Sequence, residues 1–316
     1  MKTFFFSLLS LTCSFFSHAR AHDGQIANVN GIKIWYETFG QKKNPAFLLI
    51  MGGCCQGILW PSEFCQRLAD EGFFVIRYDN RDTGLSSCFD FEKHPYSLLD
   101  MTKDAIGLLD HLKINRAHVF GLSMGGPIAQ LMAVHYPQRI LSIALVATSC
   151  EFRPMNLAYA GLPAEENSLS RPKDVYLKWM QEFQQNIPQN PEEALEQRLV
   201  CWRILSGSVV PFEEDRYREL HRLFLDRQKY PEAMKNHLFV CKNSEELIRS
   251  VSSQVRVPTV IFHGSEDAIF PIDHGEKLSQ TIPRSKFIPV HGLGHILNCA
   301  FYDLLIKELK LNASRR

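Results

Sequence analysis

The sequence predicts an α/β fold in which a mostly parallel sheet is covered by helices on both faces and carries an inserted helical cap. The strand-like runs of residues 46–148 are apolar throughout and alternate with helical patterns, which is typical of a sheet buried on both faces. Residues 151–250 contain helical patterns only, and the strand–helix alternation resumes near residue 257.

The elements of the first half follow from local patterns. Two alternating runs in residues 25–40 are joined by Asn30-Gly31, which is a strong signal for a β-hairpin. Apolar strands are expected at 46–51, 73–79, 118–121 and 140–148, and helices with apolar residues every three or four positions at 64–72, 97–112 and 124–136.

The second half is divided into a helical block and a return to the sheet. The cap is expected to hold helices at 174–187, 191–205 and 212–225, the second of them capped by Asn190 with Pro191 in its first turn. A strand at 257–264, a helix at 274–282, a strand at 285–290 and a final helix at 296–311 follow. The chain is therefore divided into core residues 22–150, cap residues 151–250 and core residues 251–316.

Residues 1–21 have the pattern of a secretory signal peptide. Lys2 precedes an uncharged apolar run at 3–16, and Ala19-Arg20-Ala21 supplies the small residues of a cleavage site. The run is shorter than the ~20 residues that span a bilayer. We expect an exported protein, periplasmic or secreted, with no stable membrane insertion after cleavage; an uncleaved N-terminal anchor is the alternative.

The charge balance excludes several classes of partner. Lys and Arg total 35 and Asp and Glu total 34, so no net field attracts nucleic acid. The sequence is 45% hydrophobic and 22% charged, as in an ordinary globular protein. We expect a small-molecule partner and no nucleic acid, while the oligomeric state stays open.

Eight cysteines follow the signal segment, and export would permit disulfides among them. A core of this size does not need them, so the sequence leaves open whether any form. They are Cys54, Cys55, Cys65, Cys88, Cys150, Cys201, Cys241 and Cys299.

The stretch "VFGLSMGGPI" at 119–128 places Ser123 between a predicted strand and a predicted helix, in the pattern Gly-x-Ser-x-Gly. A serine on such a strained turn requires residues without side chains two positions before it and two positions after it, which Gly121 and Gly125 supply. The following helix directs its N–H groups and positive dipole end toward the serine. The pattern therefore favours Ser123 as a nucleophile.

A nucleophilic serine needs a base and a carboxylate that orients the base, in the chain order Ser, acid, His. Asp267 follows a late strand and is the predicted acid, with the adjacent Glu266 as the alternative. His295, just before the last helix, is the predicted base, with His291 as the alternative. His263 ends a strand near these loops and is a candidate for a supporting role.

Acyl transfer also requires two N–H donors for the oxyanion. Met124, directly after the serine, and Gly53, in the loop after the run at 46–51, are the predicted donors. No His/Cys cluster has zinc spacing, and no phosphate loop or dinucleotide fingerprint occurs, so the sequence predicts neither metal nor cofactor.

These motifs resemble the α/β-hydrolase fold superfamily over nearly all of the chain after the signal segment. Within it the chain is similar to aclacinomycin methylesterases and related polyketide-tailoring esterases, through "LLIMGGC", "WPSEFCQRLADEGFFVIRYDNRDTGLS", "AHVFGLSMGG", "WRILSGSVVPFEED" and "HGEKLSQTIP". The resemblance implies a Ser-His-Asp hydrolase whose cap forms one wall of a substrate pocket. It supports Ser123, Asp267 and His295 as the triad and Gly53 with Met124 as the oxyanion hole.

The predicted function is hydrolysis of a carboxylic ester, such as a methyl ester, of a small hydrophobic molecule. Trp60, close after the oxyanion loop, and Trp202, in the cap, are candidates for the pocket wall. A cofactor-free acyltransferase or a carbon–carbon bond hydrolase would use the same triad. A binding protein of this fold is the third alternative.

Overall fold

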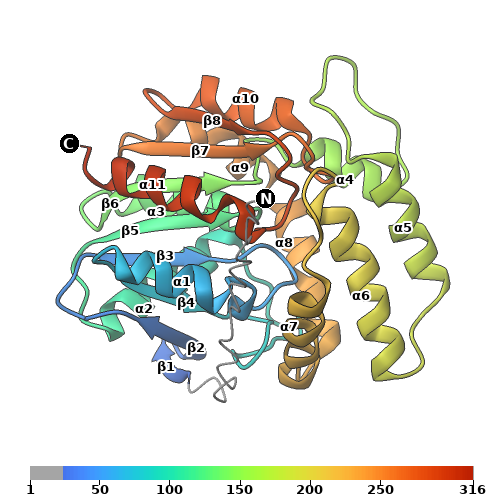
Figure 1. The fold of residues 1–316 in the computed structure, drawn as a ribbon, viewed down its shortest axis with the longest axis horizontal. Coiled ribbons are helices and arrows are strands. Elements are labelled where there is room, and N and C mark those ends of the chain that lie inside the picture. The colour runs from blue at the N-terminus through green and yellow to red at the C-terminus, as the bar shows by residue number, and fades with distance from the viewer. Residues whose placement is uncertain (1–23, 316) are drawn as a thin grey trace, which may run out of the picture.

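The computed structural model describes residues 24–315, so the predicted signal peptide at 1–21 lies outside the described residues. An eight-stranded sheet forms the centre of the molecule, with strand order β1-β2-β4-β3-β5-β6-β7-β8 (Figure 1). The strands are β1 (Gln25–Val29), β2 (Ile32–Phe39), β3 (Ala46–Ile50), β4 (Phe74–Tyr78), β5 (Ala117–Leu122), β6 (Ile140–Val146), β7 (Thr259–Gly264) and β8 (Lys286–Val290).

The sheet is antiparallel only at one edge. β1 pairs with β2 through the predicted hairpin, in which Asn30 and Gly31 both have positive φ, as a two-residue hairpin turn requires. β2 also runs antiparallel to β4, and every other neighbouring pair is parallel. The carboxyl ends of the six parallel strands therefore meet at the same edge of the sheet.

Helices cover both faces of the sheet, as the apolar strands predicted. In Figure 1 α1 and α11 lie in front of the sheet, and α2 and α3 lie behind it. The core helices are α1 (Ser62–Asp70), α2 (Leu98–His111), α3 (Gly125–His135), α10 (Ile272–Thr281) and α11 (Tyr302–Ala313).

The segment between β6 and β7 is helical, and we call residues 153–251 the insertion. In Figure 1 it lies beyond the ends toward which β3, β6 and β7 point. Asn190 caps one of its helices by accepting a hydrogen bond from the Glu193 N–H at 3.0 Å. The helices are α4 (Arg153–Tyr159), α5 (Asp174–Gln185), α6 (Pro191–Ser206), α7 (Glu214–Arg227), α8 (Asn236–Asn243) and α9 (Glu245–Val251).

The last helix begins later than the sequence pattern predicted. α11 starts at Tyr302, not at Ile296. The Asn298 side chain accepts a hydrogen bond from the Ala300 N–H at 3.0 Å and so caps a short 3₁₀ turn, which separates residues 296–298 from the helix. These residues remain in the loop after β8.

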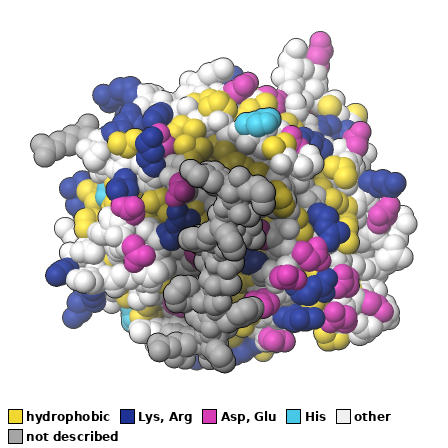
Figure 2. All heavy atoms as spheres, in the orientation of Figure 1, with side chains coloured by type: hydrophobic (Ala, Val, Ile, Leu, Met, Phe, Trp, Pro, Cys, Tyr) yellow, Lys and Arg dark blue, Asp and Glu magenta, His cyan; other side chains and the backbone are white. Residues whose placement is uncertain are grey.

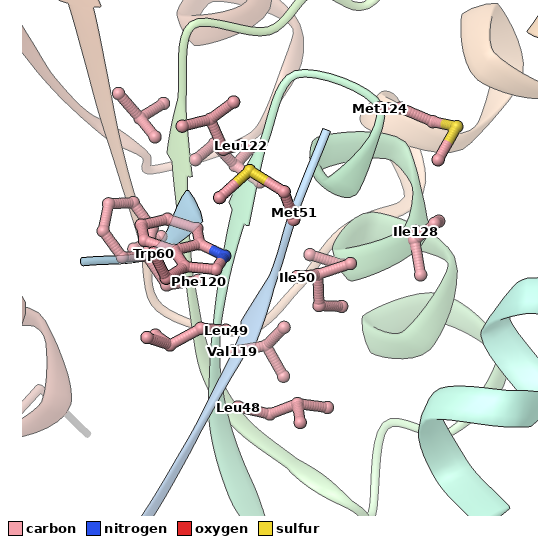
Figure 3. Packing of buried hydrophobic residues seen from close by; sticks show 14 of the residues in the cluster. Leu48, Leu49, Ile50, Met51, Trp60, Val119, Phe120, Leu122, Met124 and Ile128 are labelled. Atoms are coloured by element: carbon pink, nitrogen blue, oxygen red, sulfur yellow. The ribbon is translucent and has the colours of Figure 1, made fainter. Parts of the chain in front are cut away.

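The hydrophobic core lies between the sheet and its helices. Figure 3 shows Trp60 beside Phe120 of β5. Their ring centroids are 4.9 Å apart.

The eight cysteines of residues 24–315 are all free thiols, so the described chain contains no disulfide. Within the same range no helix has the length and hydropathy needed to cross a membrane.

Candidate active site

Ser123 occupies the sharp turn between β5 and α3. Its φ is +52°, a left-handed value that is rare for a residue with a side chain. A Cβ on Gly121 would lie 2.2 Å from the carbonyl oxygen of Gly125, and a Cβ on Gly125 would lie 2.2 Å from that of Ile50. Both glycines are therefore required by close backbone approach, as the sequence pattern predicted.

Hydrogen bonds hold the backbone of this turn. The Ser123 N–H donates to the Val146 carbonyl at 3.1 Å, and the Ser123 carbonyl accepts from the Thr148 hydroxyl and the Gly126 N–H, both at 2.8 Å. The Ser123 side chain is partly exposed, although its neighbours on both sides are buried. The turn thus holds a hydroxyl at the amino end of α3, where the helix dipole stabilises developing negative charge.

Asp267 and His295 form a direct pair. His295 Nδ1 lies 2.9 Å from Asp267 Oδ1 and 3.0 Å from Oδ2. Because an ionised carboxylate only accepts hydrogen bonds, Nδ1 carries the proton and Nε2 is left with a lone pair. Asp267 is fully buried, and His295 is 5% exposed. The pair has the geometry of a base oriented by an acid.

The loop after β7 stabilises the charge on Asp267. Burial alone raises the pKa of this carboxyl, but the charge and hydrogen bond of His295, together with His263 and the Phe270 N–H, outweigh burial and lower the pKa. The Ile269 and Phe270 N–H groups both donate to Oδ1 at 2.9 Å. Asp267 is therefore ionised at neutral pH.

The alternative acid, Glu266, and the alternative base, His291, are not part of the Asp267–His295 pair. Glu266 is in contact with the Ser208 hydroxyl at 3.3 Å, and no hydrogen bond joins it to His295. His291 is exposed on the surface. His263 lies close to the pair, with Nε2 3.7 Å from Asp267 Oδ2, and it donates from Nε2 to the Phe270 carbonyl at 2.7 Å. It supports the loop that holds the carboxylate.

The two expected oxyanion donors are neighbours in space. A Cβ on Gly53 would lie 3.5 Å from Met124 Sδ. Within residues 24–315 the N–H groups of Gly53 and Met124 have no hydrogen-bond partner. The next N–H along the loop, that of Cys54, is already bonded to His237 Nδ1 at 2.9 Å. The Gly53 N–H is therefore free to bind an oxyanion, whereas the Cys54 N–H is not.

His237 of α8 is a residue that the sequence reasoning missed. Its Nε2 donates to the Arg81 carbonyl at 2.8 Å, so its Nδ1 is free to accept from Cys54. Burial lowers the pKa of His237, which keeps the ring neutral as this bonding requires. Cys54 has a φ of +58°, and the bond to His237 fixes this unfavourable conformation directly after Gly53.

We expect His237→Ala to lower kcat about tenfold. The substitution leaves the Cys54 N–H unpaired, which costs ~1–3 kcal/mol, and the preceding Gly53 N–H is then held less firmly in the position of an oxyanion donor. Hydrolysis of p-nitrophenyl acetate and thermal unfolding are measured together. Leu238→Ala, at the neighbouring exposed position of α8, is the matched control. An unchanged kcat in a folded His237→Ala protein would show that the loop does not depend on this bond.

The two tryptophans occupy different surroundings. Trp60 is fully buried and packs against Phe64 and Phe120, which gives it a role in the core. Trp202 of α6 is 7% exposed, and its ring lies 4.6 Å from that of His221. Trp202 thus belongs to an aromatic cluster inside the insertion.

The insertion is hydrogen-bonded to the backbone beside each part of the site. Leu205 accepts from the His295 N–H at 2.7 Å, and the Lys173 N–H donates to the Ala268 carbonyl at 2.8 Å. His237 holds the loop of Gly53, as described above. Within residues 24–315 no group of three or more His, Cys, Asp or Glu side chains could hold a metal ion.

Comparison with known proteins agrees with this architecture. A family model described as alpha/beta hydrolase fold matches residues 45–299. Rhodomycin D methylesterase DauP of Streptomyces sp. (strain C5) is 33% identical over 87% of this chain and 92% of its own length. Rhodomycin D methylesterase DnrP of Streptomyces peucetius is also 33% identical, with the same coverage.

Solved structures share the fold at lower identity. An esterase from Exiguobacterium antarcticum is 19% identical with a TM-score of 0.71, covering 92% of this chain and 100% of its own. The enol-lactonase from Burkholderia xenovorans LB400 is 22% identical with a TM-score of 0.66 and the same coverage. The family model and the two methylesterases confirm the predicted fold and the predicted class of enzyme, a carboxylic ester hydrolase. The chain belongs to the α/β-hydrolase fold family.

Proposed function

We propose that the protein hydrolyses a methyl ester of a hydrophobic carboxylic acid through a Ser123-His295-Asp267 triad. The observation that carries this proposal is the pairing of His295 Nδ1 with the buried Asp267, at the sheet edge where Ser123 stands on its strained turn. That pairing leaves Nε2 of His295 as the only ring nitrogen that can take a proton.

In the first half of the reaction the Ser123 hydroxyl oxygen attacks the ester carbonyl carbon, and its proton passes to His295 Nε2. Asp267 stabilises the imidazolium that forms. The negative charge on the carbonyl oxygen is stabilised by the N–H groups of Gly53 and Met124. The bond to the alkoxy oxygen then breaks as Nε2 returns the proton to it, and methanol leaves.

In the second half water replaces the alcohol. His295 Nε2 takes a proton from the water molecule as its oxygen attacks the acyl carbon of the acyl-enzyme. The same two N–H groups stabilise the second tetrahedral intermediate. The bond to Ser123 Oγ breaks, the proton returns to that oxygen, and the carboxylic acid is released.

The methyl ester is supported by the two relatives named rhodomycin D methylesterases, which match nearly the whole chain. The hydrophobic acid follows the apolar character of the insertion, which buries the aromatic cluster of Trp202, Tyr217 and Phe224.

A panel of esters that varies acyl and alcohol size separately tests the proposal. We expect kcat/KM to be highest for methyl esters of bulky aromatic acids and a fluorophosphonate probe to label Ser123. Assays with and without added ethanol distinguish hydrolysis from acyl transfer, because a transferase would form the ethyl ester as its main product. Absence of both labelling and turnover would contradict the proposed function.

A further inference from the structure

Arg198 of α6 is a half-buried cation without an acidic partner among residues 24–315. A cation that is partly removed from water and has no counter-ion is destabilising. Burial accordingly lowers the pKa of Arg198. An arginine in this position requires an explanation.

The other arginines of α6 and α7 show how unusual Arg198 is. Each of them forms an ion pair with a carboxylate. Figure 2 shows basic and acidic side chains side by side on the part of the surface that these helices form. The pairs are Arg203–Glu214, Arg216–Glu213, Arg218–Glu196, Arg222–Glu192 and Arg227–Asp79.

Neutral contacts hold the guanidinium of Arg198 in place. Its central carbon lies 3.7 Å from the centroid of the Phe224 ring, and its Nε donates to His221 Nδ1 at 3.2 Å. Burial and the Arg198 charge lower the pKa of His221 to about 2, so His221 is neutral and accepts this bond. Both Nη groups of Arg198 have no partner in the described part of the chain.

The guanidinium is linked through Phe224 to the loop that carries Gly53. Phe224, on which it stacks, accepts a hydrogen bond through its carbonyl from Gln56 Nε2 at 2.8 Å. Gln56 is three residues after Gly53. The Nη groups of Arg198 therefore belong to a part of the insertion that is bonded to the oxyanion loop.

We propose that the Nη groups of Arg198 bind a carboxylate that the substrate carries on its acyl portion, in addition to the ester that is cleaved. This inference rests on the proposed function, because it names the substrate class of the same site. The substrates are then half-esters of dicarboxylic acids, and the charged end remains on the acyl-enzyme after the alcohol leaves.

A carboxylate fits the geometry of this guanidinium. Stacking on Phe224 and the Nε bond to His221 fix the plane and rotation of the guanidinium, and they leave the two Nη groups as a planar fork. A planar fork binds the two oxygens of a carboxylate in parallel hydrogen bonds. The lysine ammonium lacks this geometry, so Lys cannot replace Arg here without loss.

A matched pair of chromogenic esters tests the inference. Mono-p-nitrophenyl adipate and p-nitrophenyl hexanoate have acyl chains of equal length and differ only in the terminal carboxylate. We expect wild type to have the higher kcat/KM on the adipate half-ester. Arg198→Gln is expected to lower the adipate-to-hexanoate ratio of kcat/KM by about tenfold, mainly through KM, because charge-assisted hydrogen bonds are lost.

Two further variants make the result specific. Arg203→Gln removes an exposed, ion-paired arginine from the same helix and should keep the wild-type ratio. Arg198→Lys keeps the positive charge and should lower the ratio less than Gln does; it provides the test if the Gln variant does not fold. A ratio that is the same in wild type and in both Arg198 variants overturns the inference while the proposed function stands. A wild type that cleaves neither ester and is not labelled by fluorophosphonate overturns both.

Discussion

Ser123→Ala is expected to lower kcat for p-nitrophenyl ester hydrolysis by roughly 10⁴-fold or more, because the nucleophile of the acyl-enzyme is removed. The residual rate would come from water attacking a substrate that the Gly53 and Met124 N–H groups still polarise. Steady-state kinetics and labelling by a fluorophosphonate measure the effect, and labelling should disappear.

The stability of this variant should stay close to that of wild type. Alanine and serine are under the same strain at a φ of +52°, and the bonds of the turn are made by the backbone of residue 123. Ser206→Ala is a suitable control, since Ser206 is buried beside Gly294 and its hydroxyl has no hydrogen-bond partner in the described residues. If Ser123→Ala kept wild-type turnover while Ser206→Ala lost it, the nucleophile would have been assigned wrongly.

Asp267→Asn is expected to lower kcat on the order of 10⁴-fold without unfolding the protein. Two backbone N–H groups donate to Oδ1, so the amide oxygen of the substituted side chain would take that place and its NH₂ group would take the place of Oδ2. The Oδ2 position lies 3.0 Å from His295 Nδ1. A donor there favours the tautomer with its proton on Nε2, which can no longer accept the serine proton.

The neighbouring carboxylate provides the control for this variant. Glu266→Gln removes a charge one residue away, but among the described residues the Glu266 side chain is bonded only to the Ser208 hydroxyl, so kcat should change less than about twofold. The dependence of wild-type stability on pH provides a second measurement. The pKa of Asp267 is lowered in the folded protein, so its ionisation stabilises the fold above the ordinary Asp range. This stabilisation is lost as the pH falls through the lowered pKa. A loss of kcat in Glu266→Gln as large as that in Asp267→Asn would contradict the assignment of Asp267 as the acid of the triad.

The sequence predicted the features that local sterics determine. The turn at Ser123 needs glycine at two fixed distances, so the pattern identifies strand, turn and helix together. The hairpin at Asn30-Gly31 and the cap at Asn190 were predicted for the same reason, since each depends on a few adjacent residues. Chain order then led to Asp267 and His295, which the fold brings together across 28 residues.

The features that escaped prediction are contacts between distant segments. His237 meets Cys54 across 183 residues, and nothing in the sequence around either residue indicates the other. The sequence also could not predict that Arg198 lacks an acidic partner among the described residues. The sequence of α6 and α7 is rich in acidic residues, but these pair with other arginines. The late start of α11 depended on a single capping bond of Asn298 that competes with helix periodicity.

The hydrogen bonds from the insertion to all three loops of the site have a consequence for the catalytic cycle. If the insertion swings outward, the bonds from His237 to Cys54, from Leu205 to His295 and from Lys173 to Ala268 break. The open molecule then lacks a fixed oxyanion loop and a fixed imidazole at the moment when bulk water has access. In such a cycle the substrate would be admitted before the catalytic groups are assembled, and we would expect an ester to be cleaved only after it has been enclosed.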